Sequence, residues 1–201
     1  MIRITKVPDI ETERLYLRKW KKEDAKDLYD YASNPKVGPR AGWKPHESVE
    51  ESLEIIKSVF LKNTVWAMVY KESGKVIGSI GFEHKWLKGG EEVEELGYAM
   101  AEEFWDKGLM TEAAAEVIEC AFEHMRARNL LLTAFPENEP SQRVALKCGF
   151  SPDSELDMSF KDTDGREKSV LCYRMNKEQY GSFKEKAQKQ PKGKANKAGE
   201  E

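Results

Sequence analysis

The segment 104–113 is the part of the sequence best suited to bind a phosphorylated ligand. It follows a strand-like apolar run, and Gly108 stands where a long helix is predicted to begin. The first N–H groups of a helix have no acceptor within the helix, and the helix dipole makes that end positive, so it attracts phosphate. The segment has neither the Gly-Lys-Ser/Thr of a P-loop nor the GxGxxG of a dinucleotide site. Its single glycine fits an ordinary capped helix equally well.

Metal binding and disulfide bonds are not indicated by the remaining reactive side chains. The histidines fall in different predicted elements, and the cysteines are widely spaced and odd in number. Neither set has the short spacing of a zinc site or the even count of a disulfide framework. We therefore expect no metal, and reduced thiols in a cytoplasmic protein. The residues are His46, His84 and His124, and Cys120, Cys148 and Cys172.

Strands and helices are predicted in a mixed order around segment 104–113. Apolar runs and apolar-polar alternation indicate strands, and apolar residues at helical spacing indicate helices. A helix crosses between two of the strands, which predicts a mixed α/β sheet. The predicted strands are 15–20, 65–70, 76–82, 93–100, 130–135, 155–160 and 168–175. The predicted helices are 25–34, 48–60, a long helix that begins after Gly108 with its apolar face at 114–125, and 141–148.

The composition predicts one folded domain with a polar end. The chain has 201 residues, 39% of them hydrophobic, and a net charge of −3, which argues against a nucleic-acid binder. No apolar run reaches the ~20 residues of a membrane span, and the first residues lack the apolar core of a signal peptide. We predict a domain at 1–183 and a disordered lysine-rich tail at 184–201. A solvated terminus is the preferred interpretation of this tail, with an acidic partner such as RNA as the alternative.

Five segments together resemble the GNAT superfamily of N-acetyltransferases, within it the subgroup that includes ribosomal-protein N-terminal acetyltransferases. The resemblance implies an α/β (α+β) fold, a mixed and mostly antiparallel sheet splayed between its fourth and fifth strands, with flanking helices. It also implies acetyl-CoA as cosubstrate and an amine as acceptor, either a peptide or protein N-terminus, as in ribosomal proteins, or a small molecule. The segments are 12–18, 76–81, 95–98, 105–113 and 138–150.

The resemblance implies that segment 104–113 binds the pyrophosphate of acetyl-CoA. The superfamily pattern is Gln/Arg-x-x-Gly-x-Gly/Ala, and this chain has tryptophan in the first place and methionine in the sixth. The methionine departs from the pattern but should affect ligand binding little, because the family binds the pyrophosphate through backbone N–H groups. The implied binding residues are Trp105, Lys107, Gly108, Leu109 and Met110, with the hydroxyl of Thr111 as a further donor.

The pantetheine arm of the cosubstrate is expected between the strands at 93–100 and 130–135. An extended arm with amide groups can pair with strand backbone as a β-strand does. Tyr98 and Met100 are the implied contacts on the first of these strands, and Asn138 matches the family asparagine that follows the second. Asn138 also suits a turn, since proline follows two positions later.

Acetyl transfer needs a base for the amine and an acid for the departing thiolate. The family's usual base is a carboxylate on the fourth strand, which implies Glu95. Glu94 must point to the opposite face, and solvated charges at both positions are the alternative. The family's tyrosine acid is absent, because its position is Ala145. Ser141 matches a serine of the subgroup and is the implied acid or hydrogen-bond donor, although it could simply satisfy the helix start.

The segment 37–46 between the first two predicted helices is implied to shape the acceptor pocket. It contains two glycines, two prolines and Trp43, which we interpret as a wall for the amine substrate, with a stiff surface loop as the alternative. A catalytically silent CoA-binding module is the main rival function, because the tyrosine acid is missing. Members of the subgroup often form dimers, so the resemblance leaves a homodimer open.

Overall fold

The structure is a computed structural model that describes residues 7–189. Its strands form one sheet in the order β1-β2-β3-β4-β5-β6-β9-β7, with β8 paired to β9, and only the β5–β6 contact is parallel among these described strands. The strands are β1 Ile10–Glu11, β2 Leu15–Lys19, β3 Thr64–Tyr70, β4 Val76–Trp86, β5 Glu92–Met100, β6 Asn129–Ala134, β7 Ser151–Pro152, β8 Met158–Lys161 and β9 Glu167–Asn176. The helices are α1 Ala25–Ala32, α2 Val49–Ile55, α3 Leu109–Glu123, α4 Glu139–Lys147 and α5 Lys177–Lys189.

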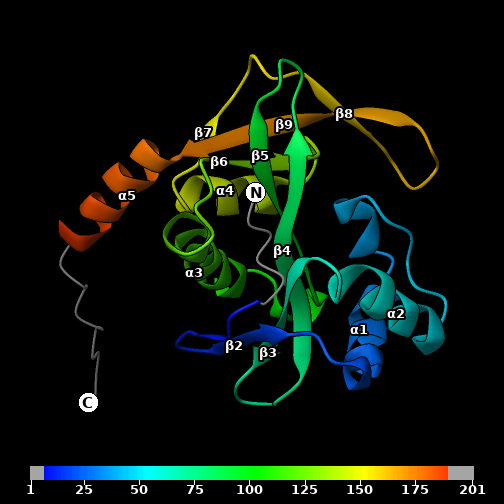
Figure 1. The fold of residues 1–201 in the computed structure, drawn as a ribbon. Helices are drawn as coiled ribbons and strands as arrows, with labels where there is room; N and C mark the ends of the chain where they lie inside the picture. Colours follow the sequence, from blue (N-terminus) through cyan, green and yellow to red (C-terminus); the bar gives the residue numbers. More distant parts are fainter. Residues whose placement is uncertain (1–6, 190–201) are drawn as a thin grey trace, which may run out of the picture.

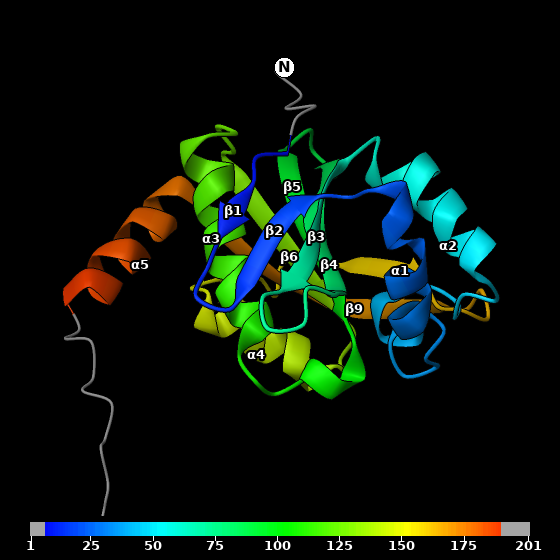
Figure 2. The ribbon, with the colours of Figure 1, turned by 90° about the horizontal axis from the view of Figure 1, so that it is seen from below.

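The helices divide between the two faces of the sheet. In Figure 1, α1 and α2 lie on one side of β4 and β5, while α3 and α4 lie on the other, and Figure 2 shows the same separation from below. Each side has its own buried core, centred on Trp20 and Ile56 beneath α1 and α2, and on Val117 and Phe122 in α3. Burial of these apolar faces against a shared sheet is what fixes the helices in place.

The sheet opens between β5 and β6, as predicted. The two strands pair only at Glu94 with Leu130 and at Glu95 with Leu131. β5 then continues to Met100 and β6 to Ala134 without further pairing between them in the described part of the chain. Their facing edges therefore leave backbone groups available in the interior of the protein. The predicted mixed, mostly antiparallel GNAT-like sheet is confirmed.

Two strands differ from the sequence predictions. β4 runs to Trp86 and pairs with β5 from Gly78 to Trp86, so the predicted strand at 76–82 was too short. The last residues of β4 are Glu83, His84, Lys85 and Trp86, so the apolar run that predicted the strand ends at Phe82. The two-residue strand β1 was not predicted, because it is held by its pairing with β2 rather than by its own composition.

The C-terminal helix α5 was not predicted, and it crosses the domain boundary predicted at residue 183. It continues to Lys189, and its residue Lys184 forms an ion pair of 2.7 Å with Glu119 of α3. The ring of Tyr180 stacks on Phe122, with the two ring centroids 4.7 Å apart. These contacts tie α5 to α3 in a way that composition could not reveal. The remainder of the predicted tail, 190–201, lies outside the described residues. Within residues 7–189 no helix is both long enough and apolar enough to span a bilayer.

Candidate active site

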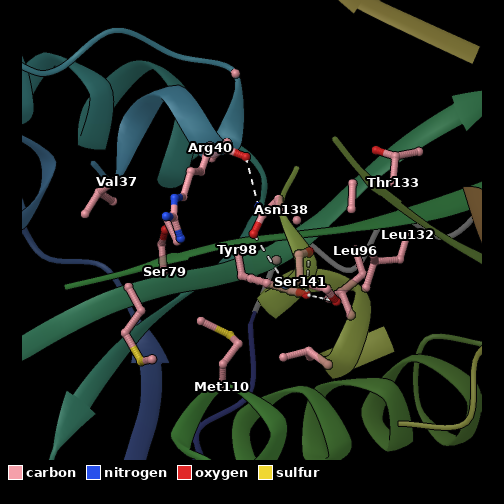
Figure 3. Close-up of a pocket in the computed structure, with 18 of the residues that line it drawn as sticks. Val37, Arg40, Ser79, Leu96, Tyr98, Met110, Leu132, Thr133, Asn138 and Ser141 are labelled. Atoms are coloured by element: carbon pink, nitrogen blue, oxygen red, sulfur yellow. Dashed lines mark hydrogen bonds between the residues drawn. The ribbon is translucent and has the colours of Figure 1, made fainter. Parts of the chain in front are cut away.

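A pocket of about 1100 Å³ opens where β5 and β6 part. Its walls come from segments far apart in the sequence: the α1–α2 connection, the parted halves of β5 and β6, the N-terminal ends of α3 and α4, and the hairpin of β8 and β9. Figure 3 shows part of this lining, with Tyr98, Ser141 and Asn138 at the centre and Arg40 above them. Most of the residues proposed from the sequence meet in this one place.

The turn before α3 forms one end of the pocket. Asp106 and Gly108 both have positive φ angles, 58° and 76°, and the first helical hydrogen bond runs from the Glu112 N–H to the Gly108 carbonyl at 3.0 Å. A left-handed residue at the helix start is accommodated without strain by glycine. Of the predicted loop residues, the pocket lining includes Trp105, Gly108, Met110 and Thr111. Lys107 and Leu109 do not line it, and their predicted contacts through backbone N–H groups stay predictions.

Trp105 anchors this turn rather than pointing its polar atom at a ligand. Its indole Nε1–H donates to the Met100 carbonyl at 2.7 Å, which ties the loop to the end of β5. The Arg40 guanidinium lies over the indole ring, 4.7 Å from its centroid. A cation above an aromatic face is a stabilising contact, and here it joins the α1–α2 connection to the loop.

Tyr98 and Ser141 form a buried hydroxyl pair inside the pocket. The Tyr98 hydroxyl and Ser141 Oγ are 2.9 Å apart, and the Tyr98 hydroxyl also lies 3.3 Å from the Ser141 carbonyl (Figure 3). Burial raises the pKa of Tyr98 above its ordinary value, so the phenol stays protonated. Tyr98 was predicted only as a contact of the cosubstrate, and its pairing with Ser141 was not predicted. A tyrosine hydroxyl is thus present near Ser141 although Ala145 occupies the family's tyrosine position.

Asn138 is the N-cap of α4. Its Oδ1 accepts from the Ser141 N–H at 3.4 Å, and its Nδ2 donates to the Arg40 carbonyl at 3.2 Å (Figure 3). Asn138 therefore has the structural role of a capping residue at the start of α4. Asn138 also lines the pocket, so the predicted contact with the pantetheine arm stays a prediction.

Glu95 is a buried carboxylate on the pocket wall. Its Oε1 accepts from Thr133 Oγ1 of β6 at 2.5 Å, and its Oε2 forms an ion pair with Lys85 of β4. Burial of the ammonium group acts to lower the pKa of Lys85, but its hydrogen bond to Glu95 and the nearby carboxylates raise it overall. Lys85 and Thr133 were not found from the sequence, because the register between strands decides which residues face Glu95. Glu94 lies on the opposite face and contacts His84 Nδ1 at 3.0 Å.

Trp43 also lines the pocket, on the α1–α2 connection. It packs so closely on Gly38 that a Cβ at that glycine would lie 2.6 Å from the indole. The His46 ring centroid lies 5.2 Å from that of Trp43, and His46 Nδ1 is 2.8 Å from Ser52 Oγ. Burial lowers the pKa of His46, although Glu51 acts in the opposite direction, so His46 is a neutral structural group near neutral pH.

Thiol and metal chemistry are not supported by the residues of this pocket. All three cysteines are buried, and burial raises the pKa of Cys148 to about 12, which keeps it a thiol. Across the described span 7–189, no cluster of histidine, cysteine or carboxylate side chains could hold a metal ion.

Comparison with known proteins identifies the class to which this fold and pocket belong. Residues 14–151 match the family described as acetyltransferase (GNAT) domain, so the chain belongs to the GNAT acetyltransferase family and is an acetyl-transferring enzyme.

Individual relatives agree with this assignment. The chain is 28% identical over 154 residues to the uncharacterized N-acetyltransferase YoaA of Bacillus subtilis, covering 74% of this chain and 86% of YoaA. The fold is similar to that of a GNAT-family acetyltransferase from Bacillus anthracis, with a TM-score of 0.73, 22% identity, and coverage of 85% and 99% of the two chains. It is also similar to that of a ribosomal-protein-S5-alanine acetyltransferase from Vibrio fischeri, with a TM-score of 0.68, 21% identity, and coverage of 84% and 96%.

Proposed function

We propose that this protein transfers the acetyl group of acetyl-CoA to a primary amine, with the reaction taking place where β5 and β6 part. The observation that carries the proposal is the coincidence of three features in one pocket. Two strand edges face each other without pairing, a helix begins at the Gly108 turn at one end, and the buried carboxylate of Glu95 lies on the wall.

The residues present fit an extended thioester with a diphosphate. The unpaired edges of β5 and β6 supply backbone donors and acceptors for the amide groups of a pantetheine arm. The turn at Gly108 and the first N–H groups of α3 supply donors for the diphosphate, and the Thr111 hydroxyl adjoins them in the lining. Acetyl-CoA would supply the activated acetyl group, and a metal is not part of the proposal.

Two groups of this chain have the chemistry to move the protons of the reaction. Glu95, held between Thr133 and Lys85, is the proposed proton acceptor for the attacking amine, directly or through a water. Ser141 is the proposed donor to the departing sulfur, and the Tyr98 hydroxyl bonded to it could replace that proton. Both hydroxyls are buried, so a hydrogen bond to a developing thiolate would be strong there.

The proposed acceptor is an exposed amine such as a peptide N-terminus, with a small-molecule amine as the alternative. Trp43 and residues of the β8–β9 hairpin both line the pocket. We propose that an amine at the end of a chain enters between them. One structural neighbour is described as acting on a ribosomal protein, which makes ribosomal-protein N-termini the first peptides to test. We further propose a cytoplasmic location, consistent with the buried free thiols, and leave the homodimer as a question for solution measurements.

The alternative function is a CoA-binding module without catalysis. It would bind CoA through the same loop before α3 but would need no general base. Calorimetry with CoA and a thiol-release assay with a panel of peptides and small amines separate the two. The proposal expects CoA binding and acetyl-CoA consumption that depends on one class of amine. Binding without amine-dependent release across the panel would favour the silent module, and absence of binding would refute both.

A further inference from the structure

The sequence segment 12–18 has a defined partner that the proposed chemistry does not explain. In the structure this segment leads from β1 into β2 and wraps around the carboxylate of Glu112, in the first turn of α3. The Thr12 hydroxyl and the Arg14 N–H both donate to Glu112 Oε1, at 2.5 and 2.8 Å. Arg14 Nε donates to Oε2 at 2.7 Å, and Arg14 Nη2 lies at the same distance from Oε2. The start of β2 is thereby fixed to the start of α3.

Arg14 also reaches the turn that precedes α3. Its Nη1 donates to the Lys107 carbonyl at 2.9 Å. In a trans peptide unit the carbonyl and the following N–H point in opposite directions, so fixing this carbonyl toward Arg14 turns the Gly108 N–H away from Arg14. Gly108 lines the pocket and Arg14 does not. This is the orientation that a phosphate-binding N–H requires.

The charge of Arg14 matters as much as its geometry. Burial acts to raise the pKa of Glu112, but the hydrogen bonds from Thr12 and Arg14 lower it overall, so this carboxylate is ionised. An ionised carboxylate in the first turn of α3 would repel a diphosphate bound at the same helix end. The Arg14 guanidinium neutralises it and lies close to the turn, with Nη2 3.6 Å from where a Cβ on Gly108 would stand.

We propose that Arg14, held by Glu112, is a positioning residue for the diphosphate of the acetyl donor. This inference rests on the proposed function, because it assumes that the donor is a CoA thioester. Arg14 orients the Gly108 N–H through the Lys107 carbonyl and cancels the charge of Glu112. It does not touch the reacting atoms.

The test compares Arg14→Met with Arg18→Met. Arg18 lies on the adjoining strand β2 and makes a similar two-point contact with a carboxylate, at 2.8 Å to each oxygen of Asp24, away from the loop. We expect Arg14→Met to weaken CoA binding by about tenfold or more in calorimetry, since the charge-assisted contacts of Arg14 with Glu112 and the Lys107 carbonyl are lost. We expect Arg18→Met to bind CoA within about threefold of wild type, at a comparable loss of thermal stability.

A truncated donor distinguishes positioning from general damage. S-acetyl-pantetheine lacks the diphosphate, so Arg14→Met should raise the KM for acetyl-CoA while leaving kcat/KM for S-acetyl-pantetheine at the wild-type value. Equal losses with both donors, or unchanged CoA affinity, would overturn the inference. If Arg14→Met does not fold, Arg14→Lys tests the orienting role alone, because a lysine keeps the charge but not the two-directional contact; it should weaken CoA binding by a smaller factor and again leave S-acetyl-pantetheine unaffected. A wild-type protein that does not bind CoA would instead overturn the proposed function.

Discussion

Substitution of Gly108 separates backbone strain from charge in the proposed cosubstrate loop. Among the described atoms, a Cβ at this position would meet only Arg14 Nη2 within 4 Å, at an ordinary contact distance of 3.6 Å, so alanine fits sterically. The φ of 76° imposes a left-handed cost of about 1 kcal/mol on any other residue, which corresponds to a fall in melting temperature of about 2–4 °C. Gly108→Ala should therefore lose this much stability.

Gly108→Asp adds a carboxylate to the same strain. At about 6 Å from a diphosphate and an effective dielectric constant of about 20, repulsion amounts to about 2–3 kcal/mol per unit charge. We therefore expect a loss of about 2 kcal/mol, or about 30-fold in CoA affinity, relative to Gly108→Ala. Calorimetry measures the affinity and thermal unfolding the stability.

The control for this pair is Gly165→Asp in the β8–β9 turn. Gly165 has a φ of 80°, no described atom lies within 4 Å of the position that a Cβ would take there, and the residue does not line the pocket. The substitution should show the strain without any effect on CoA binding. If folded Gly108→Asp binds CoA as tightly as Gly108→Ala, the loop is not the diphosphate site.

The pocket residues give three further tests. Ser141→Ala and Tyr98→Phe should each lower kcat by about tenfold with CoA affinity nearly unchanged. The kcat of the double variant should be little lower than that of either single variant, because the two hydroxyls act as a pair. A kcat reduced by the product of the two single effects would argue against the pair. Trp43→Ala should raise the KM for the amine by about tenfold while the KM for acetyl-CoA stays constant, and the reverse pattern would remove Trp43 from the acceptor wall. Burial lowers the pKa of His46, so the unfolded chain binds a proton at this imidazole at a higher pH than the folded chain does. The free energy of unfolding should therefore fall as the pH drops below about 6.5. Urea unfolding should show a smaller fall in His46→Gln than in the wild type, and equal falls in the two proteins would contradict this prediction.

Local sequence patterns predicted those features whose partners are nearby in the chain. Ser48 and Glu51 have the spacing of a capping box, which is typical of the start of a helix, and Ser48 Oγ accepts from the Glu51 N–H at 3.1 Å. The Glu51 carboxylate instead accepts from the N–H of Glu47, one residue before the position expected for a capping box. The apolar faces of the helices could likewise be predicted from short stretches of the sequence.

Features decided by tertiary register were not readable in this way. The resemblance placed Glu95 in the site, but its contacts with Lys85 and Thr133 depend on how β4, β5 and β6 align. The pairing of Tyr98 with Ser141 joins a strand to a helix 43 positions later, and alternation along β5 cannot foresee it. The same reason explains α5, which is polar by composition and is held by Lys184 against Glu119. Such contacts come from the fold and not from any single segment.

Glu95→Gln is the most direct test of the account, because it keeps the shape of the side chain and removes the proton acceptor. We expect kcat near pH 7 to fall by about 10²-fold, the usual contribution of a positioned general base, while CoA affinity stays within about threefold. The loss should shrink as the pH rises and more of the amine is already neutral. A folded Glu95→Gln protein with wild-type kcat at pH 7 would contradict the account and show that this carboxylate is not the base.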